Sequence, residues 1–197
     1  MFSLVLDTSF KEIGVALYKG ASRIDSVCYE AFRQQSEFLI VEIGKILKKN
    51  HVFPREIKTI FVNNGPGSYT GIRMSLAVSK TFSFCFKTNV VLVSSLVAQV
   101  GYSRKNVISV IDARADRAYV GLVKCGILLS SSVVSIGELR DLLEDKPNSS
   151  VVSNFDFGWH KFSSCKNSLD GIGEVMNKQV AEENPLRIEP FYFKEAV

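Results

Sequence analysis

Short apolar runs separated by turn-forming residues open this chain. Over residues 2–30 three such runs follow one another, with the sequences FSLVLD, IGVALY and ASRIDSVCYE, and their spacing predicts a three-stranded meander. An apolar stripe at helical spacing predicts a helix over about residues 36–49, which ends in lysines that suit its dipole. A strand at IKTIFVN, a second helix over about residues 71–86 and a strand at NVVLVS follow.

The chain also contains a weak internal repeat. A shift of 105 positions aligns residues 5–19 with residues 110–124, and five of the fifteen positions are identical, including Asp7 with Asp112. Average composition would yield about one identity. A third apolar run, ILLSSSVVS, again follows, and helical patterns occur at IGELRDLLED and GIGEVMNKQVAEE. We therefore expect two related lobes, residues 1–103 and residues 104–197, with less regular structure in the second.

Composition is that of a globular protein. The 197 residues are 46% hydrophobic and 22% charged, which suffices for a buried core. The net charge of +4 leaves room for a basic patch beside an RNA partner without requiring one. Four scattered cysteines form no C-x-x-C pair, so we interpret them as reduced, buried thiols. The pattern predicts no signal peptide and no membrane span, and therefore a cytoplasmic protein.

The stretch between the fourth strand and the second helix, NNGPGSYTGIR, is rich in glycine. Its candidate loop residues are Gly65, Gly67, Ser68, Thr70 and Gly71. A Walker-type phosphate loop needs Lys and then Ser or Thr where Ile72 and Arg73 stand, and a dinucleotide fingerprint needs glycine where Thr70 stands. Two interpretations remain open: an anion site at the helix start, or a tight turn that lets strand and helix pack closely. We favour the turn.

The second predicted helix is apolar on nearly all sides. Its apolar residues include Ile72, Leu76, Val78, Phe82 and Phe84. A helix with this pattern is covered on both sides. Either it is a central helix of its own domain, or a partner protein supplies part of the cover.

Polar residues with possible chemistry are few. Asp7 ends the first predicted strand, where a carboxylate could face a metal-bound phosphate or accept hydrogen bonds from its own Asp-Thr-Ser turn. His51 and His160, the two histidines, have no metal-ligand spacing. We find no convincing nucleophile, base or metal set, and therefore expect no catalytic residue and no metal site.

Four motifs stand in order along the chain: LVLDTS (4–9), GPGSYTGIR (65–73), VSSLVAQV (93–100) and IDARADRAYV (111–120). In their order and spacing they resemble the bacterial TsaB family, also called YeaZ. The family's H-S-E-x-L pattern is similar to residues 35–39, with Gln35 in place of histidine, and its closing P-x-Y-x-R is similar to residues 190–194, with Lys194 in place of arginine.

The resemblance implies an α/β, actin-like ATPase fold of ribonuclease H type, shared with sugar kinases and heat-shock chaperones, with a shortened second lobe. It further implies a non-catalytic subunit that binds and activates TsaD, the protein that transfers the threonylcarbamoyl group to the adenosine next to the tRNA anticodon. TsaE, a second copy of the chain, and tRNA reached through the complex are the other implied partners. ATP or ADP would be held by Asp7, Thr8 and Ser9.

Family members pair through the two helices of the first lobe. In this sequence the resemblance assigns the partner interface to Leu39, Ile43, Ile46, Ile72, Arg73, Leu76 and Lys80. The alternative function is an active phosphotransferase or ATPase of the same fold, in which Asp7 positions metal and nucleotide. A peptidase, an older label for the wider family, lacks a nucleophile with a base or a metal set here.

Overall fold

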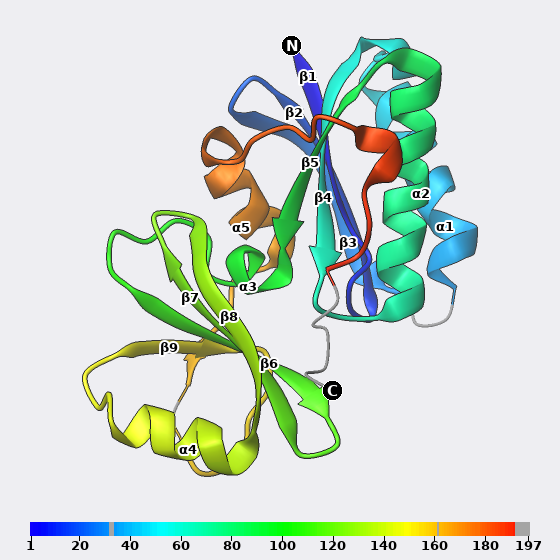
Figure 1. Cartoon of the computed structure of the whole chain (residues 1–197). Coiled ribbons are helices and arrows are strands. Elements are labelled where there is room, and N and C mark those ends of the chain that lie inside the picture. Colours follow the sequence, from blue (N-terminus) through cyan, green and yellow to red (C-terminus); the bar gives the residue numbers. More distant parts are fainter. Residues whose placement is uncertain (32–33, 161, 192–197) are drawn as a thin grey trace. The chain divides into compact units, whose positions relative to one another are not determined.

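The computed structural model describes residues 1–31, 34–160 and 162–191. It contains two compact units (Figure 1). Unit 1 comprises residues 1–95 together with 179–191, and the described part of unit 2 comprises residues 96–178. The sequence prediction placed a single boundary between residues 103 and 104, whereas the units separate after Ser95 and the chain returns to unit 1 near its C-terminal end.

Unit 1 is built on a five-stranded mixed sheet. Its strands are β1 (Phe2–Asp7), β2 (Glu12–Lys19), β3 (Ser22–Glu30), β4 (Ile57–Gly65) and β5 (Asn89–Ser94), in the order β3-β2-β1-β4-β5. The first three strands pair antiparallel, which confirms the predicted meander. β4 lies parallel to both β1 and β5, so the carboxyl ends of these three strands share one edge of the sheet.

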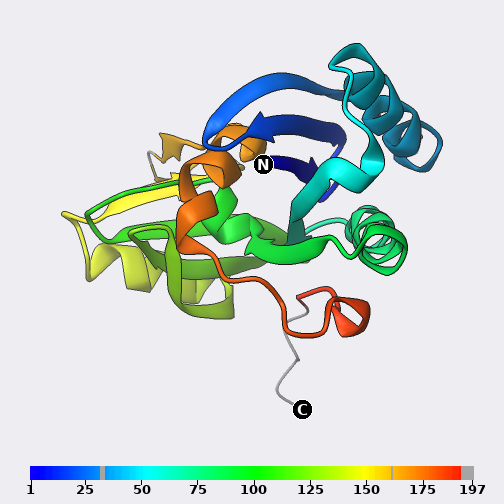
Figure 2. The same ribbon diagram turned by 90° about the horizontal axis from the view of Figure 1, so that it is seen from above.

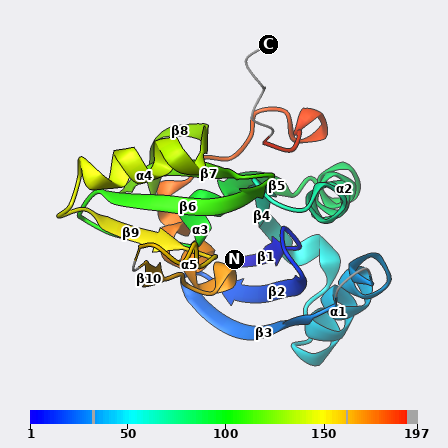
Figure 3. The same cartoon turned by 90° about the horizontal axis from the view of Figure 1, so that it is seen from below.

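Two helices cover one face of this sheet, α1 (Gln35–Lys49) and α2 (Tyr69–Phe86). Figures 2 and 3 show both on the same side of the strands. The buried stripe of α1, from Leu39 through Ile43 to Leu47, packs into the core of unit 1. The start of α2 is capped by Ser68, whose hydroxyl accepts a hydrogen bond from the Gly71 N–H.

The C-terminal segment of unit 1 runs beside β4, β5 and α2. The Glu182 N–H donates to the Val90 carbonyl at 2.8 Å, and the Phe191 N–H donates to the Asn64 carbonyl at 2.8 Å. Between these bonds Ile188 is buried in the core of unit 1. The remainder of the predicted closing motif, residues 192–194, lies outside the described residues.

Unit 2 repeats the strand arrangement of unit 1. Its strands are β6 (Val107–Arg114), β7 (Arg117–Lys124), β8 (Ile127–Ser135), β9 (Ser150–Ser153) and β10 (Ser163–Ser164), in the order β10-β9-β6-β7-β8. Its helices are α4 (Ile136–Glu144) and α5 (Ser168–Val175), and α3 (Ser95–Ala98) precedes β6. Again three antiparallel strands are followed by parallel ones, so the internal repeat predicted from Asp7 and Asp112 is a repeat of topology.

The prediction of buried cysteines was wrong. Cys28, Cys85 and Cys165 are exposed and Cys125 is half-buried. Cys28 lies on β3, an edge strand of its sheet, and Cys85 lies on the last turn of α2. Apolar neighbours in sequence did not bury Cys28 and Cys85 because adjacent positions of a strand or helix point in different directions.

Within the described residues, the structure has no helix that is both long and apolar enough to span a lipid bilayer.

Candidate functional site

A buried polar network lies where β1 and β4 end. Asp7 Oδ1 accepts hydrogen bonds from the Ser9 N–H at 2.7 Å and the Ser9 hydroxyl at 2.6 Å. Asp7 Oδ2 accepts a third bond, from Asn63 Nδ2 at 2.9 Å. All three residues are buried. Both carboxylate oxygens of Asp7 therefore take part in hydrogen bonds within the chain.

Asn63 connects this network to the glycine-rich loop. Its Oδ1 accepts a bond from the Gly65 N–H at 2.9 Å and another from the Ser95 hydroxyl at 2.7 Å. Asn63 thus uses both ends of its amide, donating to Asp7 and accepting from the loop. The network stabilises the ends of two parallel strands that would otherwise bury unpaired polar groups.

The turn after β1 and the start of α2 are also in direct contact. The Thr8 hydroxyl donates to the Gly71 carbonyl at 2.6 Å, and the Ser68 N–H donates to the Ser9 carbonyl at 2.6 Å. A Cβ atom at Gly67 or at Gly71 would overlap backbone carbonyl oxygens of this turn. These contacts support the interpretation of the glycine-rich stretch as a tight, close-packed turn.

Unit 2 carries a related but smaller turn. The Arg114 N–H donates to Asp112 Oδ1 at 2.8 Å. Like Asp7, Asp112 accepts a bond from the backbone two residues ahead, which is the Asx-turn geometry. The described residues hold no group of three or more His, Cys, Asp or Glu side chains that could bind a metal ion.

Gln35, which stands where the resembling family has histidine, fastens the start of α1 to the first hairpin. Its Nε2 donates to the Phe10 carbonyl at 2.6 Å and lies 3.4 Å from the Glu12 carbonyl. The side chain is buried. The Gln35 amide can therefore act as the hydrogen-bond donor that holds the start of α1 against the first hairpin.

The predicted partner-interface residues divide into two groups. Five of them are buried in the core of unit 1: Leu39, Ile43, Ile46, Ile72 and Leu76. In this chain they pack into the core of unit 1, beneath the helices α1 and α2, and their role at a partner interface stays a prediction. Arg73 is exposed and Lys80 is half-buried, and the Arg73 guanidinium donates to the Tyr69 hydroxyl at 2.8 Å.

The outward sides of α1 and α2 carry other apolar residues, which the sequence did not assign to the partner interface. We call them the exposed helical face: Ile40, Val41 and Gly44 on α1, and Ala77 and Phe84 on α2. Ile40 is 57% exposed and Phe84 is 68% exposed. A Cβ atom added to Gly44 would meet no neighbouring atom within 4 Å. The signal was present in the adjacent apolar residues 38–41, which cannot all face one sheet.

A charged cluster borders this face on α1. Glu42 accepts hydrogen bonds from Lys45 Nζ at 2.8 Å and from the Tyr29 hydroxyl at 3.3 Å. The hydrogen bond to the Glu42 carboxylate raises the pKa of Lys45, and burial together with that negative charge raises the pKa of Tyr29. Lys45 therefore remains charged at neutral pH and shields the buried Glu42.

The repeated strand order, with its helices and the carboxylate turn after the first strand, defines an α/β protein of the actin-like ATPase, ribonuclease H-like fold. A crystal structure of an uncharacterized Pseudomonas aeruginosa protein with similarity to peptidase YEAZ aligns with a TM-score of 0.75 at 20% identity, covering 98% of this chain and 99% of that one. YeaZ from Pseudomonas aeruginosa aligns with a TM-score of 0.68 at 19% identity, covering 98% and 99%.

Sequence comparison gives the family. The family described as TsaD, tRNA N6-adenosine threonylcarbamoyltransferase, matches residues 27–145. The tRNA threonylcarbamoyladenosine biosynthesis protein TsaB of Bacillus subtilis is 28% identical over 82% of this chain and 74% of its own length. The protein of the same name from Buchnera aphidicola subsp. Schizaphis graminum is 25% identical over 98% and 93%. The chain belongs to this family, and within it to the TsaB, or YeaZ, proteins.

Proposed function

We propose that this chain acts in the biosynthesis of threonylcarbamoyladenosine in tRNA, as a non-catalytic subunit that binds and activates TsaD. Its relatives from Bacillus subtilis and Buchnera aphidicola are named for this biosynthesis. The reaction modifies tRNA, so we place the protein in the cytoplasm. TsaE and the enzyme that makes threonylcarbamoyl-AMP complete the proposed system.

The exposed helical face is the observation that carries the proposal. It combines large apolar side chains, Ile40 and Phe84, with small residues, Gly44 and Ala77. Large side chains bury apolar area on association, and small ones let a second pair of helices approach closely. Because Ile72 and Leu76 already pack inward, only this outward side of the helix pair remains available to a partner.

The Asp7 network supports the non-catalytic part of the proposal. A carboxylate that holds a metal-bound phosphate needs an oxygen directed at the ligand. In this chain three hydrogen bonds, two from Ser9 to Oδ1 and one from Asn63 to Oδ2, already hold the Asp7 carboxylate. These bonds fit a carboxylate that stabilises the turn to which the glycine-rich loop is attached.

Co-purification with TsaD tests the partner surface. The double variant Ile40→Asp/Val41→Asp places two charges on the exposed helical face without entering the core, and we expect it to lose TsaD. The matched control is Ile127→Asp/Leu129→Asp, which changes two exposed apolar residues of β8 in unit 2 and should retain TsaD. Circular dichroism should show that both variants are folded. Undiminished TsaD binding by the α1 variant would overturn the proposed surface.

Reconstitution tests the activity. TsaD, TsaE and the threonylcarbamoyl-AMP synthase are incubated with tRNA, with or without this chain, and modified nucleoside is measured by mass spectrometry. The proposal requires more product when the chain is present and little gain from the α1 double variant. Equal product in all three reactions would contradict it. If the chain forms homodimers through the same face, TsaD should displace the second copy.

A further inference from the structure

Basic residues gather at the end of the unit 1 sheet where β1 and β4 begin, and this end is called an edge below. The register places Phe2 beside both Lys19 and Ile57, so the amino ends of β1 and β4 meet the end of β2. The ends of α1 and α2 lead into β4 and β5 at the same edge, which is opposite the glycine-rich loop. We call its exposed Lys and Arg residues the basic edge: Lys19, Arg23, Lys48, Lys49, Arg55, Lys58 and Lys87.

Acidic residues at this edge do not neutralise it. Asp25 pairs with Lys49 at 3.0 Å and accepts a bond from Asn50 at 2.8 Å. Glu56 accepts the Phe53 N–H at 2.8 Å, the Glu182 N–H donates to the Val90 carbonyl near the start of β5, and Glu183 follows Glu182 in the chain. Seven basic residues against these four acids leave an excess of three, whereas the whole chain has a net charge of +4. The named residues therefore give this edge a local excess of positive charge.

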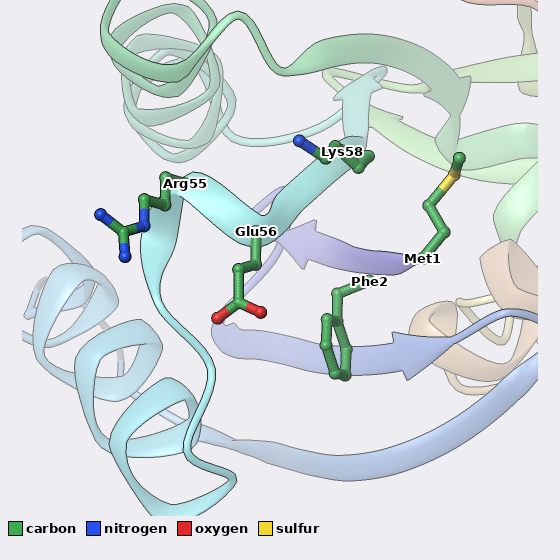
Figure 4. A pocket seen from close by; sticks show the side chains of 5 residues that line it. All are labelled: Met1, Phe2, Arg55, Glu56 and Lys58. Atoms are coloured by element: carbon green, nitrogen blue, oxygen red, sulfur yellow. The ribbon is translucent and has the colours of Figure 1, made fainter.

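An open hollow lies within the basic edge. Its volume is about 530 Å³, and it is lined by Met1, Phe2, Arg55, Glu56 and Lys58 (Figure 4). Figure 4 shows Arg55 and Lys58 on the segment that leads into and begins β4. Ligands of open α/β sheets usually bind at the carboxyl ends of parallel strands. This hollow is at the opposite ends and so is separate from the Asp7 network.

Aromatic rings accompany the cations at the basic edge. Phe53 is 61% exposed, and the Arg55 guanidinium lies 5.2 Å from the centre of its ring. Lys19 Nζ lies 5.8 Å from the centre of the Phe2 ring. Exposed rings next to basic side chains form platforms on which unpaired bases stack while the cations contact phosphates.

We propose that the basic edge binds RNA directly, with Arg55 and Lys58 contacting phosphates and Phe53 stacking against an unpaired base. An acidic protein segment would satisfy the cations but offers no planar base to the exposed ring, so the combination favours RNA. That the RNA is tRNA rests on the function proposed above. This chain then contributes to holding the substrate, in addition to binding TsaD.

Binding of a fluorescent tRNA transcript to the chain alone tests the proposal, measured by anisotropy at several salt concentrations. Arg55→Ala/Lys58→Ala should weaken binding and reduce the slope of log affinity against log salt by about 2, roughly one for each lost phosphate contact. Phe53→Ala should weaken binding at least about fivefold without changing the slope, as expected for a lost stacking contact.

The matched control is Arg104→Ala/Lys105→Ala, which removes one exposed Arg and one exposed Lys from unit 2 and should bind RNA like the unaltered chain. The proposal is overturned if Arg55→Ala/Lys58→Ala keeps its affinity and slope, or if the control loses as much. Displacement of the tRNA by polyglutamate, together with no effect of Phe53→Ala, would indicate an acidic protein partner and also overturn it.

The two proposals are separable. Arg55→Ala/Lys58→Ala should still co-purify with TsaD, whereas Ile40→Asp/Val41→Asp should still bind the tRNA transcript. Loss of TsaD binding with retained RNA binding therefore reports on the exposed helical face, and the reverse result reports on the basic edge.

Discussion

Thr8 and Gly71, which are 63 positions apart in the sequence, form a direct hydrogen bond between the Thr8 hydroxyl and the Gly71 carbonyl at 2.6 Å. This bond joins the turn after β1 to the first turn of α2. A Cβ atom at Gly71 would overlap the Thr8 carbonyl oxygen. Glycine is required here because two backbone segments touch.

Gly71→Ala should therefore destabilise the protein. The added methyl group must push the start of α2 away from the turn, and overpacking of this kind costs about 1–3 kcal/mol. Chemical denaturation measures the change. The control is Gly44→Ala on α1, where the added Cβ has open space and should instead stabilise the helix by about 0.5–1 kcal/mol. Equal effects of the two substitutions would contradict the close contact.

Truncation should affect stability strongly at Leu76 and little at Phe84, although both residues lie on α2. Leu76 is 3% exposed and belongs to the core of unit 1, so Leu76→Ala should lower the free energy of unfolding by about 2–5 kcal/mol. Phe84 lies on the exposed helical face, so Phe84→Ala should stay within about 0.5 kcal/mol. Urea unfolding of both variants checks the orientation of the helix. A large loss for Phe84→Ala alone would show that α2 is rotated.

Asp7→Asn distinguishes a structural carboxylate from a nucleotide-binding one. The new amide would put an NH2 group where a carboxylate oxygen accepts hydrogen bonds, so it would face either the donors of Ser9 or the Asn63 amide NH2. An unmatched buried group costs about 1–3 kcal/mol, and thermal unfolding should show this loss. The alternative ATPase function predicts instead that the chain alone hydrolyses ATP and that the hydrolysis disappears in Asp7→Asn. A phosphate-release assay separates the two outcomes, with Asp112→Asn as the matched variant.

Glu174 should contribute to stability at neutral pH and lose that contribution in acid. Burial by itself raises the pKa of Glu174, but hydrogen bonds from Lys166 Nζ and the Tyr102 N–H outweigh burial and leave the pKa below its ordinary value of 4.5. A carboxyl whose pKa is lower in the folded state stabilises the fold above its unfolded pKa. The stabilisation is lost as the pH falls from about 4.5 through the folded value.

Unfolding curves of the unaltered chain and Glu174→Gln, measured from neutral pH down to about pH 3, test this linkage. Glu174→Gln should be less stable at neutral pH and approach the unaltered chain in acid. Glu144→Gln, which removes a carboxylate from the exposed end of α4, serves as the charge-matched control. A stability difference for Glu174→Gln that is independent of pH would contradict the assigned hydrogen bonds.

Much of the fold could be predicted from the sequence because it depends on local patterns. The runs that form β1, β2 and β3 alternate with turn residues, and consecutive strands of this kind pair as a meander. The predicted helices over about 36–49 and 71–86 agree with α1 (Gln35–Lys49) and α2 (Tyr69–Phe86) to within two residues. The glycine spacing excluded two phosphate-loop motifs without reference to a structure.

The sequence alone determined the first meander, the two helices of unit 1, the internal repeat and the family resemblance, because each depends on short stretches of neighbouring residues. Tertiary structure decided which side of α2 faces the sheet, because apolar residues occur all round that helix. In the folded chain Ile72 and Leu76 are buried against the core, whereas Phe84 is exposed. Tertiary structure also assembled the basic edge, because strand register brings Lys19 and Lys58, far apart in the chain, to the same end of one sheet.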